Sequence, residues 1–323
     1  MQANASPPTS PRRPPKRRAL KRTLLFIIIL VLVATLGYAG YVLYKINAAI
    51  DRAGSSGAVS AGRQVDRNPV TVLLLGTDTR PQNPSLNTDV IMIASFNPDR
   101  QSATVVSVPR DTLIKVSGYS QLKANAYYAA FHHANKATAD KKTKELFGKY
   151  LNVPIDYVAR LDFNGFERIV DNLGGLKLEV DMNMCYTDKA DGTSIRLTEG
   201  THLLNGSQTL DFVRYRKGNC QNAADSNDIK RNERQQQVID QMIGKLKSVE
   251  GVLKLGSVIE AAGDSVDTDM PASEIKSFIR TYMAADRDKI NYVHLEGEWQ
   301  SPYIIVRPDE LKRAQTALRE QLK

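Results

Sequence analysis

Carboxylates stand at the ends of two apolar segments early in this chain, where they suit a divalent cation. Asp78 closely follows the apolar run 70–76, and Asp89 directly precedes the apolar run 90–96. Such runs are typical of strands buried on both faces, so we expect both carboxylates at the ends of adjacent strands. Magnesium typically takes one or two carboxylates together with phosphate oxygens and water. The alternative is that Asp78 begins a turn and Asp89 caps one.

Arginines supply positive charge that suits an anionic ligand. Arg110 follows a third apolar run, 103–109, and a guanidinium can bind a phosphate through two hydrogen bonds. A local ion pair with Asp111 is the alternative. In FVRYRK, 212–217, Arg214 and Arg216 share a face on a strand but lie roughly 200° apart on a helix. A solvated surface run is the alternative there.

The segment that follows is a predicted helix, residues 229–249. Arg231 and Gln235 are four residues apart on it and share a face, whereas Arg234 lies one step off that face. An ordinary polar helix face is the alternative. Two aspartates and several arginines in one domain suit a diphosphate bridged by Mg²⁺. We find no Walker A loop, no nucleophile elbow and no HExxH motif.

Strands that alternate with helices must position these residues. This alternation predicts an α/β fold, a three-layer α/β/α sandwich with a mixed central sheet. A helix that begins after Asn205 should end near Phe212, which places Arg214 and Arg216 on extended chain. The other expected helices are residues 123–137, 138–150, 164–175, 229–249, 272–285 and 308–323, and further strands are expected at 157–163, 176–181 and 290–297.

The net charge of +9 is concentrated at the N-terminus. The first 22 residues carry seven Lys and Arg and no acidic residue, so the rest of the chain is close to neutral. Residues 24–44 contain no charge, and a helix of that length rises about 32 Å, enough to cross a membrane. The positive-inside rule then keeps the N-terminus in the cytoplasm. A cleaved signal peptide, with an apolar core of roughly 7–15 residues, is the alternative.

The expected organisation is a cytoplasmic tail, a membrane anchor, a linker and one extracytoplasmic domain. Their boundaries are residues 1–22, 23–44, 45–68 and 69–323. The protein is then a single-pass protein of the cell membrane. Because the basic charge is local and no groove-binding motif is present, nucleic acid is not an expected partner. Cys185 and Cys220 both fall in the exported part, where a disulfide can form; two unpaired thiols are the alternative.

The motifs, taken in order, resemble the LytR-CpsA-Psr family. The resemblance covers about residues 70–250 and is carried by LLLGTDTR, NTDVIMI, VPRDT, KANAYYA, LNGSQTLDFVRYRK and DIKRNERQQQVI. Family members move teichoic acid, capsular polysaccharide or similar glycopolymers from a polyprenyl diphosphate lipid to peptidoglycan. The resemblance implies a phosphotransferase that forms a phosphodiester, with Mg²⁺ or Mn²⁺ as cofactor. It also implies a deep apolar tunnel for the polyprenyl tail.

The resemblance assigns roles to particular residues. Asp78 and Asp89 match the Mg²⁺-linked aspartates and, with Arg110, the catalytic set. The positions that match the pyrophosphate-binding set are Arg110, Arg214, Arg216, Arg231 and Gln235, together with Arg80 and Lys123, whose roles are less defined. The family usually reads R-S-D-T at the second aspartate, whereas this chain has Asn87 in place of the basic residue.

Two other functions fit the same residues. The first is a pyrophosphatase that hydrolyses the lipid diphosphate with water. The second is a membrane-anchored module that binds polyprenyl phosphates and regulates the cell wall without turnover. The residues do not identify the side chain that would deprotonate an acceptor hydroxyl, and Asp78, Asp89 and Asp111 are the candidates.

Overall fold

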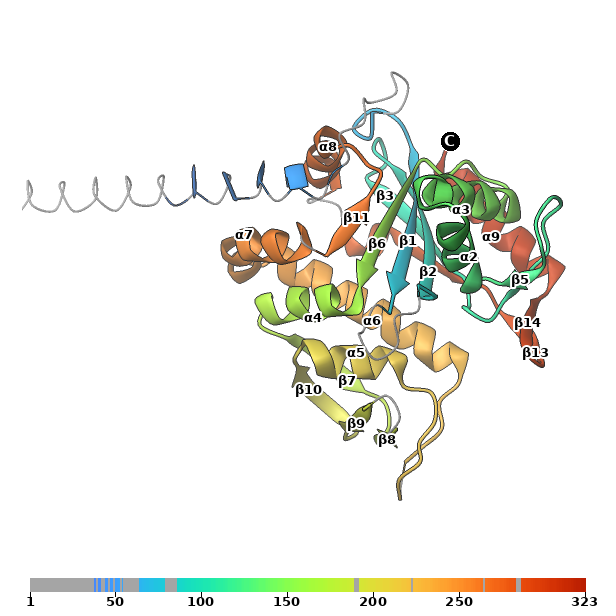
Figure 1. The fold of residues 1–323 in the computed structure, drawn as a ribbon. Helices are drawn as coiled ribbons and strands as arrows, with labels where there is room; N and C mark the ends of the chain where they lie inside the picture. Colours follow the sequence, from blue (N-terminus) through green and yellow to red (C-terminus); the bar gives the residue numbers. More distant parts are fainter. Residues whose placement is uncertain are drawn as a thin grey trace, which may run out of the picture. The chain divides into compact units, whose positions relative to one another are not determined.

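A mixed six-stranded sheet forms the centre of this computed structural model, in the order β11-β6-β1-β2-β3-β12 (Figure 1). β1 runs parallel to β6 and antiparallel to β2, and β3 runs parallel to β12. The predicted α/β class and mixed central sheet are therefore confirmed. The strands are Val70–Thr77 (β1), Thr88–Asn97 (β2), Ser102–Ser107 (β3), Tyr157–Asp162 (β6), Val266–Thr268 (β11) and Ile290–His294 (β12).

The structure describes most of the chain from residue 64 onward. The described ranges are 64–78, 86–188, 192–221, 223–263, 265–282 and 286–323, with eleven further positions between 38 and 54. The chain divides into two compact units, Met1–Tyr44 and Lys45–Lys323. The predicted tail, most of the predicted membrane span and Arg80 lie outside the described residues. Within those residues, no helix is both long enough and apolar enough to cross a membrane.

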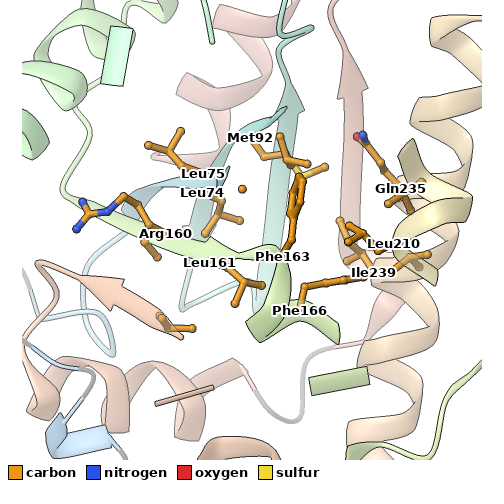
Figure 2. Close-up of a pocket in the computed structure, with 16 residues that line it drawn as sticks. Leu74, Leu75, Met92, Arg160, Leu161, Phe163, Phe166, Leu210, Gln235 and Ile239 are labelled. Atoms are coloured by element: carbon orange, nitrogen blue, oxygen red, sulfur yellow. The ribbon is translucent and has the colours of Figure 1, made fainter. Parts of the chain in front are cut away.

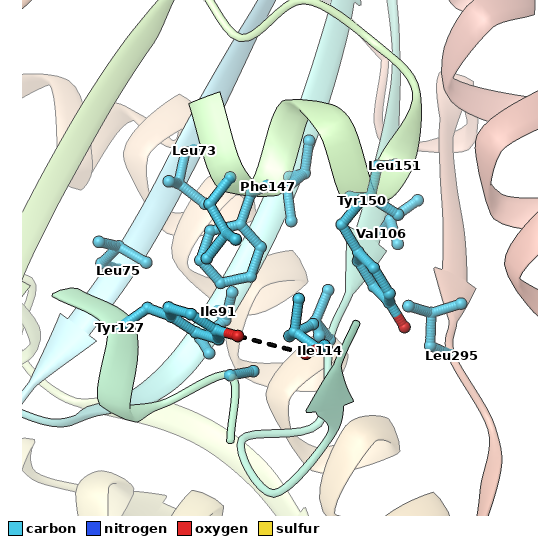
Figure 3. Packing of buried hydrophobic residues seen from close by; sticks show 14 of the residues in the cluster. Leu73, Leu75, Ile91, Val106, Ile114, Tyr127, Phe147, Tyr150, Leu151 and Leu295 are labelled. Carbon is cyan, nitrogen blue, oxygen red and sulfur yellow. Dashed lines mark hydrogen bonds between the residues drawn. The ribbon is translucent and has the colours of Figure 1, made fainter. Parts of the chain in front are cut away.

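One face of the sheet packs against α2 (Ala126–Ala134), α3 (Lys136–Leu151) and α9 (Pro308–Gln321). Because side chains alternate along a strand, Leu73, Ile91 and Ile93 all point to this face. They pack with Phe147 of α3 and Leu318 of α9 in one buried cluster (Figure 3). Burial of this apolar area is the main force that fixes the helices to the sheet.

The opposite face packs against a second group of helices. Val70 and Val72 of β1 pack with Phe278 in the C-terminal part of the chain. Leu74 and Met92 instead face a cavity, which is described below. Helices therefore cover both faces of the sheet. The helices of this group are α4 (Phe163–Asn172), α5 (Gly206–Arg214), α6 (Asp228–Lys247), α7 (Val249–Gly263) and α8 (Ala272–Tyr282).

Four two-stranded sheets surround the central sheet, and they contain the main departures from the sequence-based expectations. Lys123 lies on a short strand and not in a helix, because the helix begins only at Ala126. Asn135 interrupts the helical region and its side chain accepts a hydrogen bond from the N–H of Ala137, which starts α3. The pairs are β4 (Leu113–Ile114) with β5 (Leu122–Lys123), β7 (Leu176–Val180) with β10 (Gly200–Leu204), β8 (Met184–Thr187) with β9 (Ser194–Leu197), and β13 (Gly297–Gln300) with β14 (Tyr303–Val306).

Tyr127 of α2 fixes the β4–β5 loop against the core. Its hydroxyl lies 2.6 Å from the carbonyl oxygen of Ser120 and 3.2 Å from that of Ile114. It also accepts a hydrogen bond from the N–H of Leu122. Figure 3 shows the ring among the core side chains with its hydroxyl directed at Ile114. One buried side chain therefore satisfies several backbone groups of a loop whose ends carry Asp111 and Lys123.

We expect Tyr127→Phe to lower the free energy of unfolding by about 1–2 kcal/mol, because the variant removes the hydroxyl that bonds the buried carbonyl of Ile114 and the part-buried backbone groups of Ser120 and Leu122. Tyr150→Phe is the matched control. Tyr150 is also buried, and the hydrogen bond found at this residue is accepted by its backbone carbonyl, from Gln315. Urea denaturation measures both variants. Equal losses of stability would show that the hydrogen bonds of Tyr127 do not hold the loop.

Candidate active site

A β-bulge places Asp89 near the N-terminal end of β2, beside the C-terminal end of β1. Val90 pairs with Gly76 and Thr88 pairs with Thr77, so Asp89 has no partner in the ladder. Asp89 therefore lies inside β2, one residue later than the strand start, and not directly before the strand as expected. Bulges of this kind redirect a side chain. Because β1 and β2 are antiparallel, the end of one strand and the start of the other meet at this edge.

Asp111 is surrounded by positive charge. Its carboxylate accepts a hydrogen bond from Lys123 Nζ at 2.9 Å. The other oxygen, Oδ2, lies 3.6 Å from Arg216 Nη1 and 3.7 Å from Arg110 Nε. Arg110 also donates to Asp89, with Nη1 2.5 Å from Oδ1. The structure thus brings together three predicted cations and places both Asp89 and Asp111 next to Arg110.

Asp111 is held in its ionised form by its neighbours. Burial raises the pKa of this carboxyl, but the hydrogen bond from Lys123 and the charges of Arg110, Lys123 and Arg216 outweigh burial. The net result is a pKa below the ordinary value. A carboxylate with a lowered pKa is a weak proton acceptor. The side chain therefore holds the surrounding cations together and would be a poor general base.

Arg214 and Arg216 reach two different carboxylates. Arg214 is the last residue of α5, two residues later than the expected helix end near Phe212. Extended backbone begins at Tyr215, with ψ of 128°. Arg214 Nη2 lies 3.9 Å from Asp78 Oδ2, while Arg216 approaches Asp111. The expected extended conformation of Arg214 is wrong, and each of the two guanidiniums approaches a carboxylate of its own.

Arg234 is a structural anchor that sequence reasoning missed. It is almost fully buried, and its Nε and Nη2 bind the two oxygens of Asp181 at 2.7 and 3.0 Å. Its Nη1 donates to the backbone carbonyl of Tyr215 at 3.3 Å. The peptide between Arg214 and Arg216 is thereby tied to α6. Asp181 lies 53 residues away in sequence, so no local pattern marks this pair.

A disulfide restrains the other side of the same segment. Cys185 of β8 and Cys220 are joined with an S–S distance of 2.06 Å. The N–H of the neighbouring Asn219 donates to the carbonyl of Cys185 at 3.1 Å, and its side chain bonds the backbone of Thr187. The chain that follows Arg216 is therefore fixed to the β8–β9 hairpin.

An apolar cavity of about 330 Å³ lies beside the charged residues, a size typical of ligand sites (Figure 2). It is bounded by β1, β2, β6, α4, α5 and α6. Its polar lining residues are Gln235 of α6 and Arg160, whose guanidinium points away and pairs with Asp140 and Asp267. The apolar residues that line it are Leu74, Leu75, Gly76, Val90, Met92, Ala159, Leu161, Phe163, Phe166, Leu210, Val213, Val238, Ile239 and Val266.

Phe163 links the cavity to the charged residues near the ends of β1 and β2. We call these residues the charged cluster: Asp78, Asp89, Arg110, Asp111, Lys123, Arg214 and Arg216. Its ring lines the cavity, and the guanidinium carbon of Arg214 lies 4.9 Å from the ring centroid. Such a contact is a favourable cation–π interaction. Gly76 and Val90, which also line the cavity, are next to the strand ends that carry Asp78 and Asp89. The apolar cavity therefore adjoins the charged cluster.

Three further predicted residues, Gln235, Arg231 and Asn87, line the cavity or lie close in sequence to residues of the site. Gln235 lines the cavity, and Arg231 lies one turn earlier on α6. Asn87 directly precedes β2, next to Thr88, whose N–H donates to the carbonyl of Asn125. These three positions are close in sequence to the cluster or the cavity lining, while Arg80 is outside the described residues.

Asp78 and Asp89 are the donors on this chain that suit a magnesium ion. Carboxylates are hard oxygen ligands, and these two lie at the neighbouring ends of β1 and β2. Asp89 pairs with Arg110, and Asp78 pairs with Arg214. In the described part of the chain, no three His, Cys, Asp or Glu side chains come together as a metal site. A two-carboxylate set fits Mg²⁺ when phosphate oxygens and water complete the coordination. The donor chemistry therefore fits an ion brought in with a phosphate ligand.

Asp111→Asn should make the fold less stable at neutral pH, by about 1–3 kcal/mol, because three cations lose their common partner. The pKa of Asp111 is lowered on folding, so its contribution is present above the ordinary value of 3.8. It disappears as the pH falls through the folded-state pKa. The stability gap between wild type and variant should therefore close in acid.

Urea titrations at a series of pH values measure this gap. Asp99→Asn, at an exposed turn, is the matched control and should show no comparable gap. A gap for Asp111→Asn that stays constant down to strong acid would contradict the assignment of Asp111 as an ionised hub.

The chain is similar to known proteins in both sequence and structure. TagV of Bacillus subtilis is 26% identical over 294 residues, which cover 87% of this chain and 72% of the relative. TagU of Enterococcus faecalis is 29% identical over 310 residues, which cover 93% and 96%. Both relatives are named polyisoprenyl-teichoic acid–peptidoglycan teichoic acid transferases.

Solved structures share the fold. The crystal structure of B. subtilis TagV superposes with a TM-score of 0.63 at 24% identity, covering 79% of this chain and 98% of TagV. TagT with bound octaprenyl pyrophosphate lipid superposes with a TM-score of 0.57 at 21% identity, covering 83% and 95%. The model of the LytR_cpsA_psr family matches residues 38–320. This chain therefore belongs to the LytR-CpsA-Psr family.

Proposed function

We propose that this protein transfers an anionic glycopolymer from a polyprenyl diphosphate carrier to peptidoglycan and forms a phosphodiester. The observation that carries the proposal is the contact between Arg214 and Phe163, which joins the cationic cluster to the apolar cavity. A polyprenyl diphosphate has the same two parts, an apolar tail and a charged head group. The cavity suits the tail, and the cluster suits the head group.

The relatives support this assignment. TagV and TagU are named as transferases of teichoic acid to peptidoglycan, and TagT was solved with an octaprenyl pyrophosphate lipid. The tail of such a lipid would enter between the sheet and α4, α5 and α6. Its diphosphate would then meet Arg214, Arg216 and Arg110. These three arginines would bind the diphosphate and would not select the glycopolymer attached to it.

The proposed reaction is an in-line attack by an acceptor hydroxyl on the phosphorus that carries the glycopolymer. A P–O bond to the acceptor forms, the P–O bond to the lipid phosphate breaks, and polyprenyl phosphate leaves. Phosphoryl transfer of this kind depends on positioning and charge neutralisation more than on a protein nucleophile. The guanidiniums supply fixed charge, because arginine stays protonated at working pH.

The proton of the acceptor hydroxyl needs a base. Asp111 is unsuited, since the surrounding cations lower its pKa. Asp78 and Asp89 remain as candidates, and they are also the residues that would hold Mg²⁺. The bound ion would neutralise phosphate charge as a Lewis acid. We further propose that residues 23–44 anchor the protein in the cell membrane, with the domain on the extracytoplasmic side.

Arg214→Ala and Asp89→Ala should each lower turnover by about 10²–10³-fold, the cost of removing one electrostatic stabiliser of a transition state. The assay uses the purified full chain in detergent, a lipid-linked teichoic acid as donor and peptidoglycan oligomers as acceptor. Arg196→Ala, on the exposed face of β9, is the matched control and should keep wild-type turnover.

Product analysis decides between the candidate functions. Polymer attached to peptidoglycan identifies a ligase, whereas free polymer with polyprenyl phosphate identifies hydrolysis of the diphosphate. If both variants keep wild-type turnover, the cluster is not the site of transfer.

Removal of divalent cations tests the proposed metal. A chelator should abolish turnover of the full chain, and Mg²⁺ or Mn²⁺ should restore it, because the carboxylates need an ion to hold phosphate oxygens beside them. Asp89→Asn should require roughly tenfold more Mg²⁺ for half-maximal turnover. Full activity in the presence of chelator would sink the metal proposal while leaving the transferase assignment intact.

A further inference from the structure

The β13–β14 hairpin is attached directly to the charged cluster. The N–H of Ile304 donates to the carbonyl of Asp111 at 2.9 Å, and Ile304 forms a parallel bridge with Thr112. Trp299 stands opposite Ile304 on the neighbouring strand. Two strand spacings therefore separate Trp299 from the cluster backbone, roughly 10 Å. In Figure 1 the hairpin projects beside the β4–β5 region of the domain.

Trp299 is the only tryptophan of the chain, and its side chain is 57% exposed. Among the described residues of the unit Lys45–Lys323, Leu203 is the other large apolar side chain that is exposed. Exposure of an indole costs free energy that burial would recover. Trp299 therefore offers an exposed aromatic surface near the cluster backbone.

The surroundings of Trp299 are polar. Every residue of β13 is exposed, and the neighbours of Trp299 along the strand are Glu298 and Gln300. Ser301 at the turn is exposed as well. Because side chains alternate along a strand, Glu298 and Gln300 point to the face opposite Trp299, while Gly297 and the exposed Ser301 lie two residues away on its own side. A single exposed aromatic side chain in such surroundings is not a contiguous apolar patch of the kind that binds another protein. It matches a sugar ring, whose polarised C–H groups stack on the negative face of an aromatic ring and whose hydroxyls need hydrogen-bond partners.

We propose that Trp299 is a stacking platform for the acceptor saccharide, on the glycan strand of peptidoglycan. This inference rests on the proposed transferase function. The lipid cavity adjoins the cluster at Arg214, through Phe163, whereas the hairpin adjoins it at Asp111. The cavity and the hairpin thus adjoin different residues of the cluster. A glycan stacked on Trp299 reaches toward the diphosphate without competing for the cavity.

The first test uses the fluorescence of the sole tryptophan as a direct probe. Peptidoglycan glycan oligomers are titrated into the full chain in detergent, without donor. The emission of Trp299 should shift or be quenched with saturation, and malto-oligosaccharides of equal length should leave it unchanged. No change at saturating peptidoglycan oligomer, or an equal change with both sugars, would overturn the proposal.

The second test separates acceptor binding from catalysis. Trp299→Ala should raise the KM for the acceptor by roughly tenfold, as truncation of an interface tryptophan commonly does, with the KM for the lipid-linked donor unchanged. Trp299→Phe keeps an aromatic face and should lose less than Trp299→Ala. Leu203→Ala is the matched control, because it removes the other exposed apolar side chain and should leave both KM values unchanged.

Equal acceptor KM values for wild type and Trp299→Ala would overturn the platform even when the wild type is an active ligase. Conversely, an inactive wild type would refute the transferase function but would leave the fluorescence titration readable. The two failures are therefore distinguishable.

Discussion

The convergence of cations around Asp111 is the constraint on which the rest of the site depends. Lys123, Arg110 and Arg216 each approach its carboxylate, and like charges this close repel one another without a shared counter-charge. Asp111 supplies that charge from a buried position at the end of the segment that follows β3. A bound diphosphate would then meet cations that already lie close together in the fold. The carboxylate therefore offsets the repulsion between these three cations.

Backbone anchors hold these cations in place. Long side chains lose conformational entropy when they are fixed, so the peptide that carries them must be rigid. Arg234 provides this rigidity from α6, through the carbonyl of Tyr215 and a two-point contact with Asp181. The Cys185–Cys220 disulfide restrains the same segment from the other side. Arg216 lies between these two restraints, and Arg214 directly precedes Tyr215.

The sequence was informative where function depends on local pattern. Buried strands are visible as apolar runs, so the strand ends that carry Asp78 and Asp89 could be located within a residue or two. The mixed sheet and most helices followed from alternation and periodicity. The hairpins were missed because short exposed strands such as β13 carry no apolar signal. The end of α5 was misplaced because the capping box at Asn205 and Gln208 marks only where a helix starts.

Long-range contacts could not be predicted in the same way. The pair of Arg234 and Asp181 depends on how α6 packs against β7, because Asp181 directly follows that strand. The cavity depends on side chains from strands and helices spread between residues 74 and 266. No local window contains either feature. The bulge at Asp89 is also invisible in sequence, since it arises from the register of two paired strands.

The boundary between cavity and cluster constrains how a lipid diphosphate can sit. Moving charged phosphate into the apolar lining would cost far more than the tail gains, whereas leaving the tail in water forfeits its burial. In the proposed complex the head group would therefore lie where Phe163 meets Arg214, and its orientation would follow from the direction of the tail. The apolar cavity would then position the phosphorus. Binding energy from the unreactive tail would orient the reacting group, and remote binding energy used in this way raises a rate.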